Sequence, residues 1–62
     1  MAWFIVATQS GTEVRYKSIE TFDAVENLRD SILDEGRYYP VRVEDEQGRT
    51  ILDEVALHRL GK

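Results

Sequence analysis

One segment near the middle of the chain has the pattern of an amphipathic helix, and it constrains the fold more than any other feature. Its apolar residues recur at three- and four-residue steps, at Phe22, Val25, Leu28 and Ile32. This spacing places them along one side of a helix. Thr21 is a suitable N-cap, and Gly36 stands where a glycine commonly ends a helix. The pattern predicts a helix between these two residues.

The segment before this helix has the pattern of a β-hairpin. Residues 3–8 are apolar and β-prone, and residues 13–17 alternate polar with apolar side chains, as a strand with one solvated face does. Residues 9–11 end in a glycine and fit a three-residue loop. Such a loop would place Val6 opposite Val14.

A second hairpin and a short helix are predicted after the long helix. Residues 39–44 alternate, residues 46–48 repeat the loop chemistry of the first turn, and residues 49–52 return as a strand. From Asp53 the chain offers a capping side chain and then apolar residues on one side before Gly61, which predicts a helix of about two turns. The predicted element order is therefore ββαββ followed by a short helix.

The composition of the four strands predicts their order in one sheet. The first strand is apolar on both faces, which favours an inner position. The second carries three charged residues, and the third contains Pro40, which lacks a donor for a central ladder. With the helix as a right-handed crossover, the predicted order is 2-1-4-3, with the first and fourth strands parallel in a mixed sheet.

This single α+β domain over residues 1–62 resembles a β-grasp, as in the small immunoglobulin-binding domains of streptococcal protein G. The resemblance covers the order and length of the elements over most of the chain, without a shared motif. It therefore implies a fold and no binding residues.

Length and composition limit the functions available. A chain of 62 residues forms one small core, which excludes a two-domain enzyme with an interior cofactor. The sequence contains no cysteine, so disulfides and thiolate metal sites are excluded as well. The apolar run from Ala2 to Ala7 is too short for a membrane span or a signal peptide, and we expect a cytoplasmic protein without a membrane partner.

No residue pattern indicates catalysis. His58 is the only histidine and falls in the charged tail, where it is expected to be a solvated residue at a helix end. The four glycines are scattered, one at each turn or helix end, so the sequence has no glycine-rich phosphate loop. The acidic run at residues 44–46 is most simply a solvated hairpin tip. We therefore predict no catalytic residue, no metal site and no cofactor.

The long helix carries an acidic ridge, which we define as Asp23, Glu26, Asp30 and Asp34. At 100° per residue these carboxylates fall within an arc of about 80°, opposite Val25, Leu28 and Ile32. They would attract a basic protein partner or mimic the phosphates of a nucleic acid. The simpler interpretation is a solvated helix face that keeps an acidic chain, with a formal charge of -4, in solution.

A second candidate surface follows from the sheet, because one helix cannot cover both of its faces. If Phe4 and Val6 turn toward the helix, the other face holds an apolar strip with a basic rim. This candidate protein-binding surface consists of Trp3, Ile5, Arg15, Lys17, Arg42 and Leu52. Two alternatives stay open: the tail helix covers this face, or one of the turns has only two residues, which would exchange the faces of a strand.

These features predict a small, non-catalytic protein-binding module that acts as a homodimer, an adaptor or an inhibitor through the open sheet face. Tryptophan and arginine are frequent among the residues that dominate protein interfaces. The alternative is an acidic nucleic-acid mimic that inhibits a nucleic-acid-binding protein through the ridge. Direct binding of nucleic acid by aromatic stacking is disfavoured, because the net charge of the chain is negative.

Overall fold

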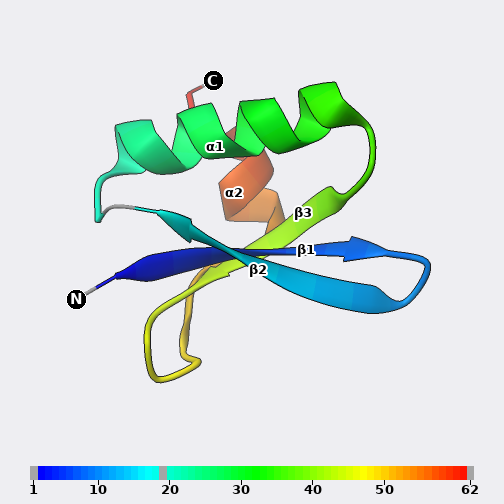
Figure 1. The fold of residues 1–62 in the computed structure, drawn as a ribbon. Coiled ribbons are helices and arrows are strands. Elements are labelled where there is room, and N and C mark those ends of the chain that lie inside the picture. The colour runs from blue at the N-terminus through cyan, green and yellow to red at the C-terminus, as the bar shows by residue number, and fades with distance from the viewer. Residues whose placement is uncertain (1, 19, 62) are drawn as a thin grey trace.

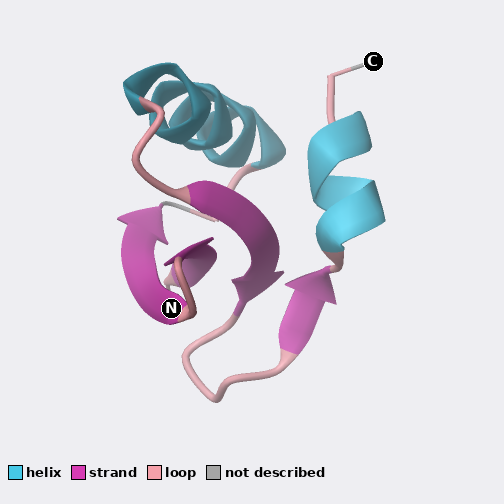
Figure 2. Cartoon of the chain, turned by 90° about the vertical axis from the view of Figure 1, so that its right-hand side faces the viewer, coloured by secondary structure: helices cyan, strands magenta, loops and turns pink. Residues whose placement is uncertain are grey.

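A computed structural model describes residues 2–18 and 20–61 of the chain. The elements are β1 (Trp3–Gln9), β2 (Thr12–Ser18), α1 (Phe22–Glu35), β3 (Tyr39–Glu44), β4 (Thr50–Leu52) and α2 (Glu54–Arg59). The strands form one antiparallel sheet in the order β2-β1-β3-β4, and α1 lies across one face of it (Figure 1). The second helix stands beside the first at the β4 end of the sheet (Figure 2). The predicted α+β class and element order are confirmed.

The order of the strands differs from the predicted 2-1-4-3 in its last two members. β3 pairs with β1, and β4 pairs with β3 at the edge of the sheet. The prediction placed β3 at the edge because of Pro40, but the pairing of β3 with β1 shifts register beside the proline: Val6 pairs with Arg42 and Ala7 with Pro40, so the extra residue, Val41, forms a β-bulge in β3. β4 pairs with Val43 and Glu44 and ends before it reaches the proline. The predicted parallel central pair is therefore wrong, and the mixed, β-grasp-like sheet is not found.

The turn between β1 and β2 has two residues where three were predicted. Gln9 pairs with Thr12, which leaves Ser10 and Gly11 as the turn. Both turn residues have positive φ, 51° for the serine and 84° for the glycine. This combination is typical of a type I′ turn, whose twist matches that of the two strands it joins.

The shorter turn exchanges the two faces of β1. Val6 pairs with Arg15, and the predicted pairing with Val14 is wrong. Ile5 pairs with Tyr16 and is fully buried in the core. Because alternate residues of a strand point to opposite faces, the odd-numbered residues of β1 lie under the helices and the even-numbered residues lie on the open face.

α1 begins and ends where the sequence predicted. Thr21 accepts a hydrogen bond of 3.1 Å from the backbone N–H three residues later, and Gly36 ends the helix with a φ of 70°. Val25 and Ile32 of the predicted stripe are buried. Arg29 shares this buried side with an exposed fraction of only 6%, although it was not part of the stripe.

α2 completes the core on the part of the sheet that lies beyond α1. Its residue Leu57 has an exposed fraction of 0% and belongs to a cluster with Ile5, Ala7, Val25, Ile32 and Val43. At the start of the helix, Asp53 accepts a hydrogen bond of 2.8 Å from a backbone N–H. At its end, Arg29 of α1 donates to the carbonyl oxygens of Leu57 and Leu60 at 2.8 and 2.7 Å. Both ends of this short helix are therefore capped by side chains.

Candidate functional site

The six residues predicted to form one binding surface are divided between the two faces of the sheet. Trp3, Ile5 and Leu52 lie on the helix-covered side, where Ile5 is fully buried and the other two are half-buried. Arg15, Lys17 and Arg42 lie on the open face. The structure does not bring these two groups together, because the two-residue turn exchanges the faces of β1 and because Leu52 of β4 pairs with the buried Val43.

The open face of the sheet carries a network of ion pairs. Arg42 donates from Nε to Glu44 at 2.6 Å and from its terminal nitrogens to Glu13 at 3.2 and 3.3 Å. These hydrogen bonds, the one to Glu44 first, raise the pKa of Arg42. The guanidinium of Arg15 lies 4.5 Å from the centroid of the Phe4 ring. Paired charges of both signs thus cover the face that was predicted to hold an apolar strip.

The acidic ridge of α1 is interrupted by an ion pair. Arg29 lies 2.8 Å from Asp30 through Nη2 and donates to the same carboxylate oxygen from Nε at 3.0 Å. The carboxylate of Glu26 lies against Gly61 and occupies the space that a side chain there would need. The two end members of the ridge, Asp23 and Asp34, are exposed. The ridge therefore presents less charge than four carboxylates indicate, since a buried arginine pairs with one of them.

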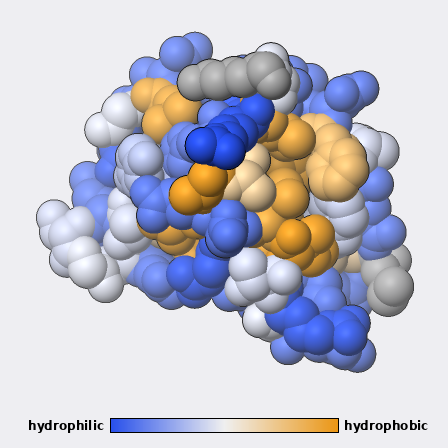
Figure 3. Space-filling view, turned by 180° about the vertical axis from the view of Figure 1, so that it is seen from behind, coloured by the Kyte–Doolittle hydropathy of each residue, from blue (hydrophilic) through white to orange (hydrophobic). Residues whose placement is uncertain are grey.

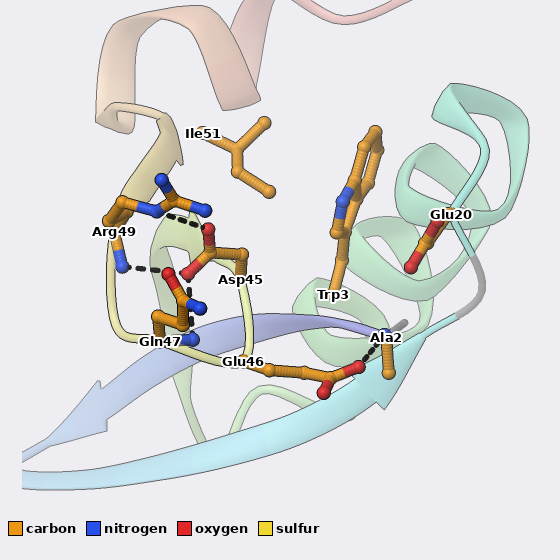
Figure 4. A pocket seen from close by; sticks show the side chains of 8 residues that line it. All are labelled: Ala2, Trp3, Glu20, Asp45, Glu46, Gln47, Arg49 and Ile51. Atoms are coloured by element: carbon orange, nitrogen blue, oxygen red, sulfur yellow. Dashed lines mark hydrogen bonds and ion pairs between the residues drawn. The ribbon is translucent and has the colours of Figure 1, made fainter.

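A pocket of about 150 Å³ opens between the start of β1 and the loop that joins β3 to β4. The indole of Trp3 forms one wall, and Ile51 faces it across the opening (Figure 4). The lining residues are Ala2, Trp3, Glu20, Asp45, Glu46, Gln47, Arg49 and Ile51. We call this site the Trp3 pocket.

Hydrogen bonds within the β3–β4 turn hold the wall opposite the indole. Asp45 accepts from the backbone N–H groups of Gln47 and Arg49, both at 2.9 Å, and from Nε of Arg49 at 2.8 Å. The backbone hydrogen bond from Arg49 is the main cause that lowers the pKa of the Asp45 carboxyl. Gly48, with a φ of 83°, closes the three-residue loop that the sequence predicted. The wall is thus a turn of defined geometry.

The indole is supported on its other side by the start of α1. The rings of Trp3 and Phe22 are 5.6 Å apart at an interplanar angle of 45°, and Phe22 has an exposed fraction of 54%. Seen from behind, hydrophobic residues gather over the middle of this side of the molecule (Figure 3). Leu52 and Leu60 are half-buried against the core. The exposed ring of Phe22 therefore continues the apolar wall that Trp3 forms.

Of the residues that line the pocket, only Trp3 was among the predicted site residues. The pairing of Phe4 with Glu44 brings the β3–β4 turn beside Trp3, and this pairing depends on the strand order that the sequence analysis missed. The signals in the sequence were a lone tryptophan at the start of a strand and a turn of defined loop chemistry. Nothing in their spacing indicated that they meet.

The histidine predicted to be solvated is instead held by the core. His58 Nε2 lies 2.7 Å from the carbonyl oxygen of Pro40. Its ring stacks on that of Tyr39, with centroids 4.9 Å apart and an interplanar angle of 16°. These two contacts hold α2 against β3, so His58 connects two elements of the fold.

The described residues contain no ready site for a metal ion. Within 2–18 and 20–61, no three histidine, aspartate or glutamate side chains are grouped closely enough to bind one.

In the same part of the chain, no helix has the length and apolar character needed to cross a membrane. Comparison of the chain with protein-family models, with curated proteins and with solved structures found no match.

Proposed function

We propose that this chain is a non-catalytic protein-binding module and that the Trp3 pocket is its contact surface. The observation that supports this most is the indole of Trp3, which forms one wall of an apolar pocket open at the surface. Tryptophan is enriched among the residues that dominate the free energy of protein binding, and such residues lie in pockets from which water is excluded. A partner seated between Phe22 and Ile51 would bury continuous apolar surface.

The size of the pocket favours a protein partner over a small-molecule substrate. Sites for cofactors and drug-sized ligands commonly occupy roughly 300–1,000 Å³. The Trp3 pocket has about 150 Å³. An engineered cavity of about that volume in another protein holds one benzene molecule. The pocket therefore suits a single aliphatic or aromatic side chain, which a protein partner would supply.

Site-specific photocrosslinking in cells that make the protein tests this surface. The photoreactive residue p-benzoylphenylalanine replaces Gln47 at the pocket or, as a matched control, Lys17 on the open face. We expect a crosslinked partner from position 47 that is lost when Ile51→Asp is added. A crosslink to a second copy of the chain would identify a homodimer, and a different protein would identify an adaptor or inhibitor function. Crosslinks from position 17 alone would contradict the proposal.

An acidic nucleic-acid mimic is the second candidate function. It is supported by the exposure of Asp23 and Asp34 and by the negative charge of the chain. It is weakened by the pairing of Asp30 with Arg29. The same method, with the photoreactive residue placed at Asp34 as well, separates the two functions, since a nucleic-acid-binding protein that crosslinks from position 34 and not from position 47 would favour the mimic.

A further inference from the structure

We propose that two copies of this chain pair antiparallel through the outer edge of β2, so that their two sheets join into one. The inference goes beyond the proposed function, because β2 contributes no residue to the lining of the Trp3 pocket. It follows from the length of this edge, from the direction of its backbone groups and from the order of its side chains.

β2 is the longer of the two edge strands of the sheet. It has seven residues, Thr12–Ser18, whereas β4 at the other edge has three. Within residues 2–18 and 20–61, no element lies beyond the outer side of β2 (Figure 2). The outward N–H and C=O groups of such an edge form a template for a further strand.

The first turn determines which backbone groups of β2 point outward. The pair that closes a two-residue turn, here Gln9 and Thr12, exchanges hydrogen bonds, and along an antiparallel ladder such pairs alternate with pairs that do not. Val14 and Tyr16 are therefore hydrogen-bonded to β1. The residues between them direct their N–H and C=O groups away from the sheet, and these are Glu13, Arg15 and Lys17.

The sequence of β2 is complementary to itself when two copies pair about Arg15. The outward residues then form three pairs, each of which exchanges two backbone hydrogen bonds. Glu13 of each copy lies opposite Lys17 of the other, and Val14 lies opposite Tyr16. Opposite charges, and an aromatic ring beside a β-branched side chain, are both stabilising as cross-strand pairs.

Arg15 would lie opposite its own copy, but its side chain is directed away from the outer edge. Its Nη2 lies 3.7 Å from Oε1 of Glu44, and its guanidinium lies 4.5 Å from the centroid of the Phe4 ring. Those two residues belong to β3 and β1, on the inner side of β2. The two guanidinium groups would therefore point away from each other across the new strand pair.

The charges of Glu13 and Lys17 are accessible to a second copy. Lys17 is exposed and has no ion pair within the described part of the chain. Glu13 is bound to Arg42 at 3.2 Å, yet about half of its side chain is exposed, at 52%. Its carboxylate can thus accept a second cation, and the pairing would give Lys17 the partner that it lacks.

The side of α1 nearest the second copy carries little charge. Glu26 lies against Gly61, just beyond α2, and α2 stands at the β4 end of the sheet, so the opposite side of α1 faces the β2 edge (Figure 2). At 100° per residue, four residues lie about 140–180° from Glu26, namely Ala24, Leu28, Ser31 and Glu35. Only the last of these is charged. The acidic ridges of two copies would therefore not meet.

Hydrogen exchange of backbone amides, followed by NMR at about 20 μM and about 1 mM protein, tests the pairing in the unmodified chain. We expect the amides of Glu13, Arg15 and Lys17 to exchange at least about tenfold more slowly at the higher concentration. The amides of Val14 and Tyr16 are the internal control, because their hydrogen bonds lie within one copy and protect them at both concentrations. Fast exchange of the three outward amides at both concentrations would overturn the inference.

A pair of charge reversals tests the register. Lys17→Glu would place two glutamates opposite each other, and Glu13→Lys would place two lysines opposite each other. In sedimentation equilibrium we expect either variant alone to dimerise at least about fivefold more weakly than wild type, and their equimolar mixture to form a heterodimer of about wild-type affinity. Arg59→Glu is the matched control, since it makes the same change of charge on an exposed residue of α2 and should weaken the dimer less than about 1.5-fold.

The remaining outcomes separate this inference from the proposed function. Equal weakening by Lys17→Glu and Arg59→Glu would overturn the inference, because dimer formation would then follow net charge. So would a mixture that dimerises no more tightly than its components. Since Lys17 lies on the β2 edge, we expect position 17 to crosslink to a second copy, and the proposed function is tested by the partner crosslinked from position 47. Crosslinks from position 17 to a second copy alone would support the dimer and remove the proposed function.

Discussion

Arg29 of α1 and Leu57 of α2 are joined by a hydrogen bond of 2.8 Å from Nη1 to the carbonyl oxygen, although 28 positions separate them in the chain. The same nitrogen donates to the carbonyl oxygen of Leu60 at 2.7 Å. The end of a helix leaves carbonyl groups without partners, and here a buried guanidinium supplies the donors. Arg29 therefore couples the C-terminal helix to the rest of the fold.

Replacement of this arginine tests the coupling. Arg29→Met keeps an apolar side chain of similar length and removes the donors to two carbonyl groups, so we expect it to lower the free energy of unfolding by about 2 kcal/mol. Urea denaturation followed by circular dichroism measures the change. Asp30→Asn serves as the control, because it weakens only the pair with a half-exposed carboxylate and should cost about 0–1 kcal/mol. Equal losses would show that the ion pair, and not the cap, provides the stability.

One residue of α2 is buried and another is exposed, so we expect their substitutions to lower the free energy of unfolding by different amounts. Leu57 has an exposed fraction of 0% and Val55 of 59%. We expect Leu57→Ala to lower the free energy of unfolding by about 3 kcal/mol, since it opens a cavity in the core. Val55→Ala should change it by less than about 0.5 kcal/mol. Similar small effects in chemical denaturation would mean that α2 does not belong to the cooperative core.

The type I′ turn predicts that substitutions at its two positions change the stability of the protein in opposite directions. Gly11→Ala forces a Cβ into the left-handed region, at a cost of about 1–2 kcal/mol. Ser10→Asn places a residue that tolerates positive φ where a serine now has a φ of 51°, and it should raise stability by roughly 0.5 kcal/mol. Thermal unfolding of both variants provides the measurement. If Gly11→Ala stabilises the protein, the two-residue turn and the assignment of faces are both wrong.

The lowered pKa of Asp45 predicts a loss of stability in acid. A carboxyl whose pKa is lower in the folded state stabilises the fold above its unfolded pKa of about 3.9 and loses this contribution as pH falls through the folded value. We expect wild type to melt at a higher temperature than Asp45→Asn between pH 5 and 7. The difference should shrink progressively below about pH 4. A difference that stays constant down to pH 2 would show that the charge of Asp45 does not contribute.

The helices could be predicted because their signals are local. The side chains of Thr21 and Asp53 cap N–H groups within three residues, and Gly36 ends α1 through its own φ. The apolar stripe of α1 likewise acts over one or two turns. The buried arginine was missed because its partners lie 28 and 31 positions away, on a helix whose placement the sequence does not indicate.

The faces of β1 could not be predicted from the strand itself. Apolar residues occupy both its odd and its even positions, so burial of either set removes similar apolar area from water. Which of the two sets is buried then depends on the length of the first turn, because one residue more or less exchanges the two faces of the strand. The strand order depends in the same way on the β-bulge beside Pro40. Because the Trp3 pocket needs both features, it could not be found from the sequence.

The position of Ala2 on the lining of the Trp3 pocket affects how the protein should be handled. Its backbone N–H donates to Glu46 in the same lining. An affinity tag fused in front of Ala2 would leave the molecule beside the opening and compete with whatever enters it. The other end of the described chain, at Gly61, lies against Glu26 of α1 and not beside the start of β1 (Figure 1). Immobilisation through that end keeps the entrance accessible to a ligand in solution.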